Sequence, residues 1–103
     1  MIRAEFYEKK GLLTGFKFSG HSGYAEAGED VACAAVSSAV QLTANLLEEL
    51  DCSPDINVGD NVIECICGKG GDVPSRVLNV LKKHFEAILE EFPNTIKIII
   101  SEV

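Results

Sequence analysis

The chain of 103 residues carries 9 Lys and Arg against 16 Asp and Glu, so its formal net charge is −7. This length is typical of a single domain, residues 1–103. The hydrophobic fraction of 47% is higher than that of disordered chains. The acidity excludes a duplex-binding surface of clustered Lys and Arg, so we expect no direct nucleic-acid binding and favour a basic protein partner.

Alternating apolar residues predict a β-hairpin at the start of the chain, over residues 2–7 and 12–19. Four side chains of its second strand are expected on one face: Leu12, Thr14, Phe16 and Phe18. Residues 20–30, GHSGYAEAGED, contain three glycines and show no periodicity. They predict a loop that is long for so small a domain, and such loops are often functional.

Apolar residues at steps of three and four predict a helix from Val31 to about Leu50, with Asp30 as its N-cap. Two short apolar runs follow, at residues 56–58 and 62–67. The residues between them, Gly59-Asp60-Asn61, are of the types that tight turns require, so a second hairpin is predicted here.

A second helix is predicted from Asp72, taken as its cap, to about Glu91. The last run, TIKIIISEV, has isoleucines on both faces, which predicts a strand inside a sheet. The element order ββαββαβ indicates the α+β class: a two-layer domain with two helices packed on one face of a mixed or antiparallel sheet.

The glycine-rich residues 68–71 invite a phosphate-binding interpretation, but they lack the GxxxxGK[ST] spacing, and a turn explains the glycines equally well. Cys65 and Cys67 share one face of a strand and are interpreted as small buried thiols. The other Cys and His residues form no second pair of ligands, so we expect no metal or cofactor. His84 is interpreted as a surface histidine beside the second helix's apolar stripe.

No apolar run approaches the roughly 20 residues that span a bilayer, and the start, MIRAEFYEKK, lacks the apolar segment of a signal peptide. We therefore expect a cytoplasmic protein that makes no membrane contact. In that compartment the 4 cysteines are expected to be reduced thiols.

Cys33 and His21 are the candidate catalytic residues. With Asp30 as N-cap, Cys33 is the third helical residue, where unpaired N–H groups and the helix dipole favour a thiolate, the nucleophilic form. The glycine-rich loop can fold His21 back over this helix end, and an imidazole there takes the thiol proton and later protonates the leaving amine. The spacing leaves open the alternative that Cys33 is one more small helix residue and His21 a loop side chain.

Two further residues have two possible roles each. Ser37 lies one helical turn after Cys33, where its hydroxyl can contact the histidine, the thiol or the substrate, or else bond its own helix carbonyl at residue 33. Asp30 can act as a cap alone, or it can also hold the imidazolium of His21. N–H groups at the helix start, that of Cys33 among them, are candidates for the oxyanion hole. Gly23 and Gly28 are candidate hinges of a loop that orders when substrate binds.

The residues Gly20 to Val40, GHSGYAEAGEDVACAAVSSAV, resemble the signature of the bacterial ribosomal-processing cysteine proteases called Prp. The shared pattern is a GHxGY start, a short loop that ends in an acidic residue, and a CAAVS helix. Chain length, the glycine-rich stretch and the isoleucine-rich final strand agree with the family more loosely.

The resemblance implies an endopeptidase that removes the N-terminal extension of large-subunit ribosomal protein number twenty-seven, after a short apolar sequence that contains an aromatic residue. It implies that His21 is the catalytic histidine and Cys33 the nucleophile, that Gly20 and Asp30 matter to the site, and that the protein is a homodimer. Ribosomal protein tails are basic, so a chain of charge −7 attracts them.

Two other classes of function compete with this interpretation. One is a non-catalytic, ribosome-associated binding module in which Cys33 is structural. The other is a small thiol redox protein, which is disfavoured because Cys52 lies a whole helix away from Cys33.

Overall fold

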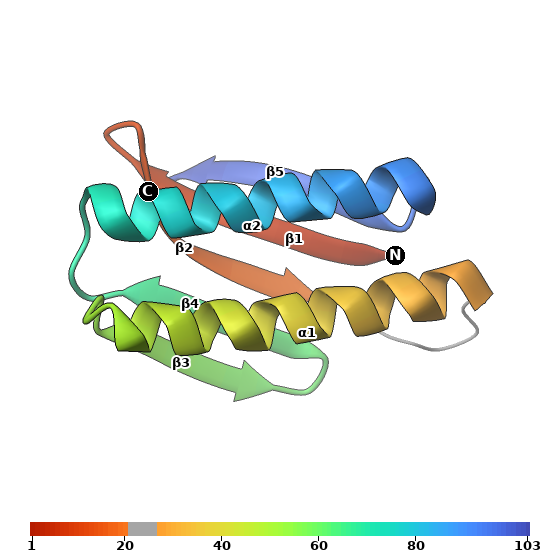
Figure 1. Ribbon diagram of the computed structural model, residues 1–103, viewed down its shortest axis with the longest axis horizontal. Helices are drawn as coiled ribbons and strands as arrows, with labels where there is room; N and C mark the ends of the chain where they lie inside the picture. Colours follow the sequence, from red (N-terminus) through yellow and green to blue (C-terminus); the bar gives the residue numbers. More distant parts are fainter. Residues whose placement is uncertain (21–26) are drawn as a thin grey trace.

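A computed structural model of the chain describes residues 1–20 and 27–103, with residues 27–30 described by their backbone alone. These residues form five strands and two helices in the order ββαββαβ. Both helices lie against one face of a mixed sheet, which gives two layers (Figure 1). The predicted class and element order are confirmed.

The sheet has the strand order β3-β4-β2-β1-β5. Its strands are β1 (Ile2–Lys9), β2 (Leu12–Ser19), β3 (Pro54–Gly59), β4 (Val62–Cys67) and β5 (Ile96–Glu102). Neighbours run antiparallel except β5, which pairs in parallel with β1. The prediction of a final strand inside the sheet is therefore wrong, because β5 forms an edge. Its isoleucines occupy both faces because Ile96 enters the core, whereas Ile99 is half-buried beside Glu5 on the face without helices.

The first hairpin is confirmed, but the predicted face of its second strand is wrong near the turn. Pairing with β1 shifts register between Gly15 and Leu13, which makes Thr14 an extra residue. Such a shift moves the side chains between Thr14 and the turn to the opposite face. Leu13 is therefore only 4% exposed, whereas Leu12 is 37% exposed. The buried N–H of Leu13 donates to the Ser75 hydroxyl at 3.0 Å, which ties the bulge to the second helix.

Gly15 of β2 lies opposite Ile66 of β4, close to the backbone of that strand. A Cβ atom there would collide with the carbonyl oxygen of Cys65 and lie 3.1 Å from Cδ1 of Ile66. We expect Gly15→Ala to lower the free energy of unfolding by about 1–3 kcal/mol, measured by urea denaturation, because backbone must move to admit the methyl group. Gly70→Ala is the control, since nothing lies within 4 Å of its Cβ position. Equal stability of the two variants would contradict this close approach.

The two helices are α1 (Ala27–Glu49) and α2 (Asp72–Glu91), which run antiparallel side by side (Figure 1). Helix α1 begins four residues before the predicted start at Val31, so the predicted 20–30 loop is too long and Asp30 is not the N-cap. Glu29 and Asp30 instead lie in the first turn, where acidic residues stabilise a helix. This start also changes the position of Cys33 along the helix.

Helix α2 spans the predicted residues, but its cap differs from the prediction. The N-cap is Gly71, with φ 127°, and Asp72 is the first helical residue. L-amino acids with a side chain rarely adopt this φ, so the turn itself requires the glycine. The turn therefore explains Gly71 without a phosphate, and a Cβ atom at Gly68 would lie 3.0 Å from the carbonyl oxygen of Ser53.

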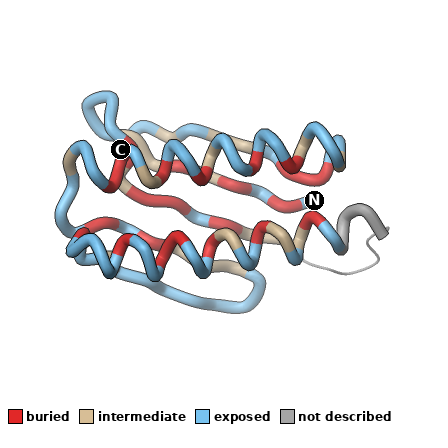
Figure 2. Tube along the Cα trace, in the orientation of Figure 1, coloured by how far each residue is buried: buried red, intermediate tan, exposed pale blue. Residues whose placement is uncertain are grey.

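The core is formed by buried residues of the sheet strands and of both helices, which are red in Figure 2. Four aromatic rings form its centre: Phe6, Phe16, Phe18 and Phe85. The rings of Phe18 and Phe85 meet edge to face with centroids 5.0 Å apart, a favourable geometry that joins β2 to α2.

By length and composition, residues Val31–Glu49 of α1 suffice to cross a membrane, which differs from the sequence-based expectation that no run does. One side of this stretch packs on the sheet through buried residues: Ala32, Val36, Val40 and Leu47. Packing in the core accounts for these four residues, whereas Val31, Leu42 and Leu46 of the same stretch are exposed.

Candidate active site

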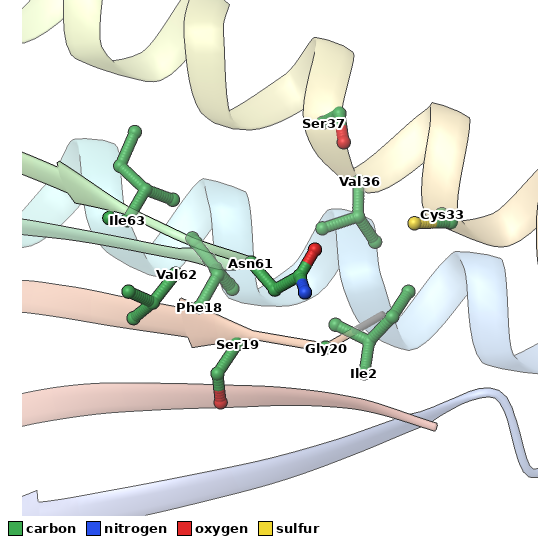
Figure 3. A pocket seen from close by; sticks show the side chains of 11 residues that line it. Ile2, Phe18, Ser19, Gly20, Cys33, Val36, Ser37, Asn61, Val62 and Ile63 are labelled. Atoms are coloured by element: carbon green, nitrogen blue, oxygen red, sulfur yellow. The ribbon is translucent and has the colours of Figure 1, made fainter. Parts of the chain in front are cut away.

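A pocket of about 260 Å³ lies between α1, the end of β2 and the β3–β4 turn, and it contains Cys33 (Figure 3). Its lining is mainly apolar: Ile2, Phe18, Val36, Val62 and Ile63. The polar or small lining residues are Ser19, Gly20, Cys33, Ser37, Gly59 and Asn61. No charged side chain lines the pocket within the described residues. It therefore suits an apolar segment of a ligand.

Cys33 is half-buried, and its thiol points into the pocket (Figure 3). Counted from Ala27 it is the seventh residue of α1, not the third as predicted. At this depth the N–H of Cys33 belongs to the helical i→i−4 pattern, so it is not a free oxyanion donor. The dipole effect also falls off within the first turn. The explanation of a thiolate by the helix end is therefore wrong, and the role of Cys33 depends on the pocket.

The other cysteines differ from Cys33 because all three are buried: Cys52, Cys65 and Cys67. Burial raises the pKa of the Cys52 thiol. A hydrogen bond between the thiols of Cys65 and Cys67, together with burial, raises the pKa of Cys65. The interpretation of Cys65 and Cys67 as small buried thiols is confirmed. Within the described residues no group of three or more His, Cys, Asp and Glu is placed to hold a metal ion.

Ser37 lines the same pocket as Cys33, one turn along α1. In the described part of the chain its hydroxyl makes no hydrogen bond, so the alternative bond to the carbonyl of residue 33 is absent. Thr43, by contrast, donates to the Ala39 carbonyl at 2.7 Å. The Ser37 hydroxyl is thus available to a ligand, and its functional role stays a prediction.

Gly20 brings the end of β2 to the pocket. Its N–H donates to the carbonyl oxygen of Asn61 at 3.1 Å, and a Cβ atom would lie 3.1 Å from Cα of Ile2. Glycine is therefore favoured by this close approach to β1. The residue that follows Gly20 in the chain is His21.

Several predicted site residues cannot be compared with the structure in full. His21 and Gly23 lie outside the described residues. Gly28 and Asp30 lie in the first turn of α1, with nothing described of their side chains. The roles predicted for His21 and Gly23 stay predictions, as does a contact of Asp30 with His21. The cap role of Asp30 is wrong, and so is the hinge role of Gly28, because both residues lie within α1 and not in a loop before it.

The structure adds Asn61, which the sequence indicated only as a turn residue. It lies in the β3–β4 turn and lines the pocket opposite Cys33 (Figure 3). A pattern of turn residues locates the hairpin but does not show which other strand its tip meets. That depends on the pairing of β2 with β4, which is not local in sequence.

A family model described as Cysteine protease Prp matches residues 1–97 of the chain. The chain belongs to this family. Membership in the Prp family makes cysteine peptidase chemistry the activity class of the chain. None of the curated proteins matches the sequence.

Three solved structures share the fold of this chain. SMU.848 from Streptococcus mutans is 24% identical, with 100% of this chain and 99% of that chain covered and a TM-score of 0.85. Prp from S. aureus, an essential ribosomal processing protease solved with a substrate peptide, is 23% identical over 98% of this chain and 100% of that chain, with a TM-score of 0.86. The same S. aureus protease with a covalently linked product peptide is 24% identical, with a TM-score of 0.83. The match covers 98% of this chain and 100% of that chain.

Proposed function

We propose that this protein is a cysteine endopeptidase that removes the N-terminal extension of large-subunit ribosomal protein number twenty-seven. Cys33 is the nucleophile, and His21 is the general base and acid. The observation that carries the proposal is the half-buried thiol of Cys33 in an apolar pocket whose opposite wall ends at Gly20, the residue before His21.

The reaction follows from the chemistry of a thiol and an imidazole. His21 takes the proton of Cys33, and the thiolate attacks the scissile carbonyl to form a tetrahedral intermediate. The C–N bond then breaks as His21 protonates the leaving amine, which is the new N-terminus of the ribosomal protein. The thioester that remains is hydrolysed by a water molecule that His21 deprotonates, and the extension leaves as a carboxylate. No metal or cofactor takes part in this scheme.

The pocket and the net charge both fit such a substrate. Five apolar residues line the pocket: Ile2, Phe18, Val36, Val62 and Ile63. They suit a short apolar sequence with an aromatic residue ahead of the cleaved bond. The net charge of −7 attracts a basic ribosomal protein at long range, although salt screens this attraction beyond about 8–10 Å.

The proposal is tested with the unprocessed ribosomal protein and the purified chain, by intact-mass analysis of the mixture. We expect the precursor to lose its extension in one step and the two product masses to sum to that of the precursor plus one water. Stable binding without any cleavage would support the alternative of a ribosome-associated binding module. A disulfide between Cys33 and a second cysteine of the chain, formed without cleavage, would support the redox alternative.

We further propose that the protein is cytoplasmic, in keeping with its four free thiols, and that it forms a homodimer. A groove of about 680 Å³ between α1 and α2 supports the dimer, because its apolar side chains Leu42 and Val80 are 68% and 65% exposed. A second copy of the chain would cover these side chains.

The dimer is tested by substituting one residue of this groove. We expect Leu42→Glu to convert dimers to monomers in sedimentation velocity, because the carboxylate would be buried without a partner. Leu50→Glu is the matched control, since Leu50 is 44% exposed and does not line the groove. A wild-type chain that sediments as a monomer at micromolar concentration would contradict the homodimer.

A further inference from the structure

Asn61 occupies a fixed position at the tip of the β3–β4 hairpin. Its φ of 56° is left-handed, a conformation that Asn tolerates better than most residues. Its carbonyl oxygen accepts the Gly20 N–H at 3.1 Å, so the tip is bonded to the end of β2. The side chain therefore projects from an anchored turn.

The carboxamide of Asn61 points into the pocket from the wall opposite Cys33, with Val36 beside it (Figure 3). Within the described residues it makes no hydrogen bond, and the side chain is exposed. The Ser19 hydroxyl points away from Cys33 (Figure 3). Among the described lining residues, Asn61 and Ser37 thus offer polar side-chain atoms to a ligand beside the thiol of Cys33.

A peptide that enters this pocket brings main-chain N–H and C=O groups along with its apolar side chains. These groups lose water on binding, and each one left without a partner costs about 1–3 kcal/mol. A carboxamide offers both a donor and an acceptor, which matches the two polar groups of a peptide unit. The apolar lining offers the main chain neither.

We infer that Asn61 is a substrate-binding residue whose carboxamide hydrogen-bonds the main chain of the extension beside the scissile bond. This inference rests on the proposed function. A main-chain contact binds substrate and transition state alike, so it acts on KM and leaves kcat nearly unchanged. Such a main-chain contact does not depend on which side chains the substrate carries. Those side chains are selected by the apolar lining.

The left-handed φ alone could account for an asparagine at this position, and glycine separates the two roles. Asn61→Gly keeps the backbone conformation while it removes the carboxamide. Asn94→Gly is the matched control, because Asn94 also has a left-handed φ, 65°, in the turn before β5 and does not line the pocket.

The experiment measures kcat and KM on a peptide that spans the cleavage site, with the melting temperature of each variant. For Asn61→Gly we expect KM to rise about 5- to 20-fold, as for the loss of one or two hydrogen bonds, with kcat within about two-fold. Asn94→Gly should match the wild type in all three quantities. An unchanged KM for Asn61→Gly, an equal change in both variants, or a fall in kcat alone would overturn the inference.

A second measurement keeps the inference separate from the proposed function. The same peptide, fluorescently labelled, is titrated into Cys33→Ser and into Cys33→Ser with Asn61→Gly, and fluorescence polarisation gives the two dissociation constants. We expect the double variant to bind about 5- to 20-fold more weakly. If the wild type does not cleave the peptide, the proposed function fails, and equal or absent binding by both variants overturns the role of Asn61.

Discussion

Replacing Cys33 with Ser is expected to reduce cleavage of the ribosomal precursor by at least about 10³-fold, because a nucleophile and its base act as one unit. Serine keeps the size of the side chain, but its hydroxyl is a far weaker acid than a thiol, so the nucleophilic anion is scarcely formed. The half-buried position of Cys33 at the pocket wall makes this substitution mild for the fold. We expect the melting temperature and the binding of the precursor to stay near wild-type values.

Cys52→Ser is the control for this prediction. It also converts a thiol to a hydroxyl, but Cys52 is buried and does not line the pocket. This variant should lose stability and retain cleavage at a temperature where it is folded. Cleavage that survives Cys33→Ser and is lost with Cys52→Ser would place the nucleophile elsewhere.

His21→Ala is expected to reduce cleavage by about 10²- to 10⁴-fold, the usual contribution of a general base and acid. His84→Ala should leave it near the wild-type rate. His84 is exposed on α2 and lines the α1–α2 groove instead of the pocket that contains Cys33. Neither substitution should change the free energy of unfolding by more than about 0.5 kcal/mol.

The two histidines, the only ones in the chain, make this comparison decisive. A rate measured on the ribosomal precursor under single-turnover conditions separates the chemical step from product release. If His84→Ala abolished cleavage and His21→Ala did not, the general base would lie on the helix groove and the proposed dyad would be wrong.

Elements with a strong local pattern were predictable from the sequence. Helix α2 is recognised from its apolar stripe, and each hairpin from its turn residues. Both signals come from residues that are close in the chain, and the structure has these elements where the sequence predicts them. The bulge at Thr14 and the edge position of β5 depend on pairing between distant strands. A period of two along one strand carries no information about its partners.

The start of α1 shows a different limit. The residues before Val31 include Gly28, which lowers helix propensity by about 1 kcal/mol relative to Ala, so the sequence favours a loop there. The structure continues the helix back to Ala27. With this earlier start, the helix dipole no longer explains a thiolate at Cys33. The side chain of Cys33 nevertheless lines the pocket.

The sequence predicts which site residues share a helix face, but it does not predict which residues other elements bring to the pocket. Cys33 and Ser37 lie four residues apart on one helix, so their shared face was predictable. Asn61 joins them only because β4 pairs with β2, which brings the hairpin tip to Gly20. His21 lies outside the described residues, so its catalytic role rests on the sequence motif.

The most direct test of Cys33 as the nucleophile uses a peptide chloromethyl ketone whose sequence is that of the extension up to the cleaved bond. A thiolate in the pocket displaces chloride and forms a C–S bond to the methylene carbon, which is permanent. We expect intact mass to show one adduct per chain, peptide mapping to place it on Cys33, and cleavage to stop in proportion to labelling. An adduct on another residue, or full activity in a chain labelled at Cys33, would contradict the proposed mechanism.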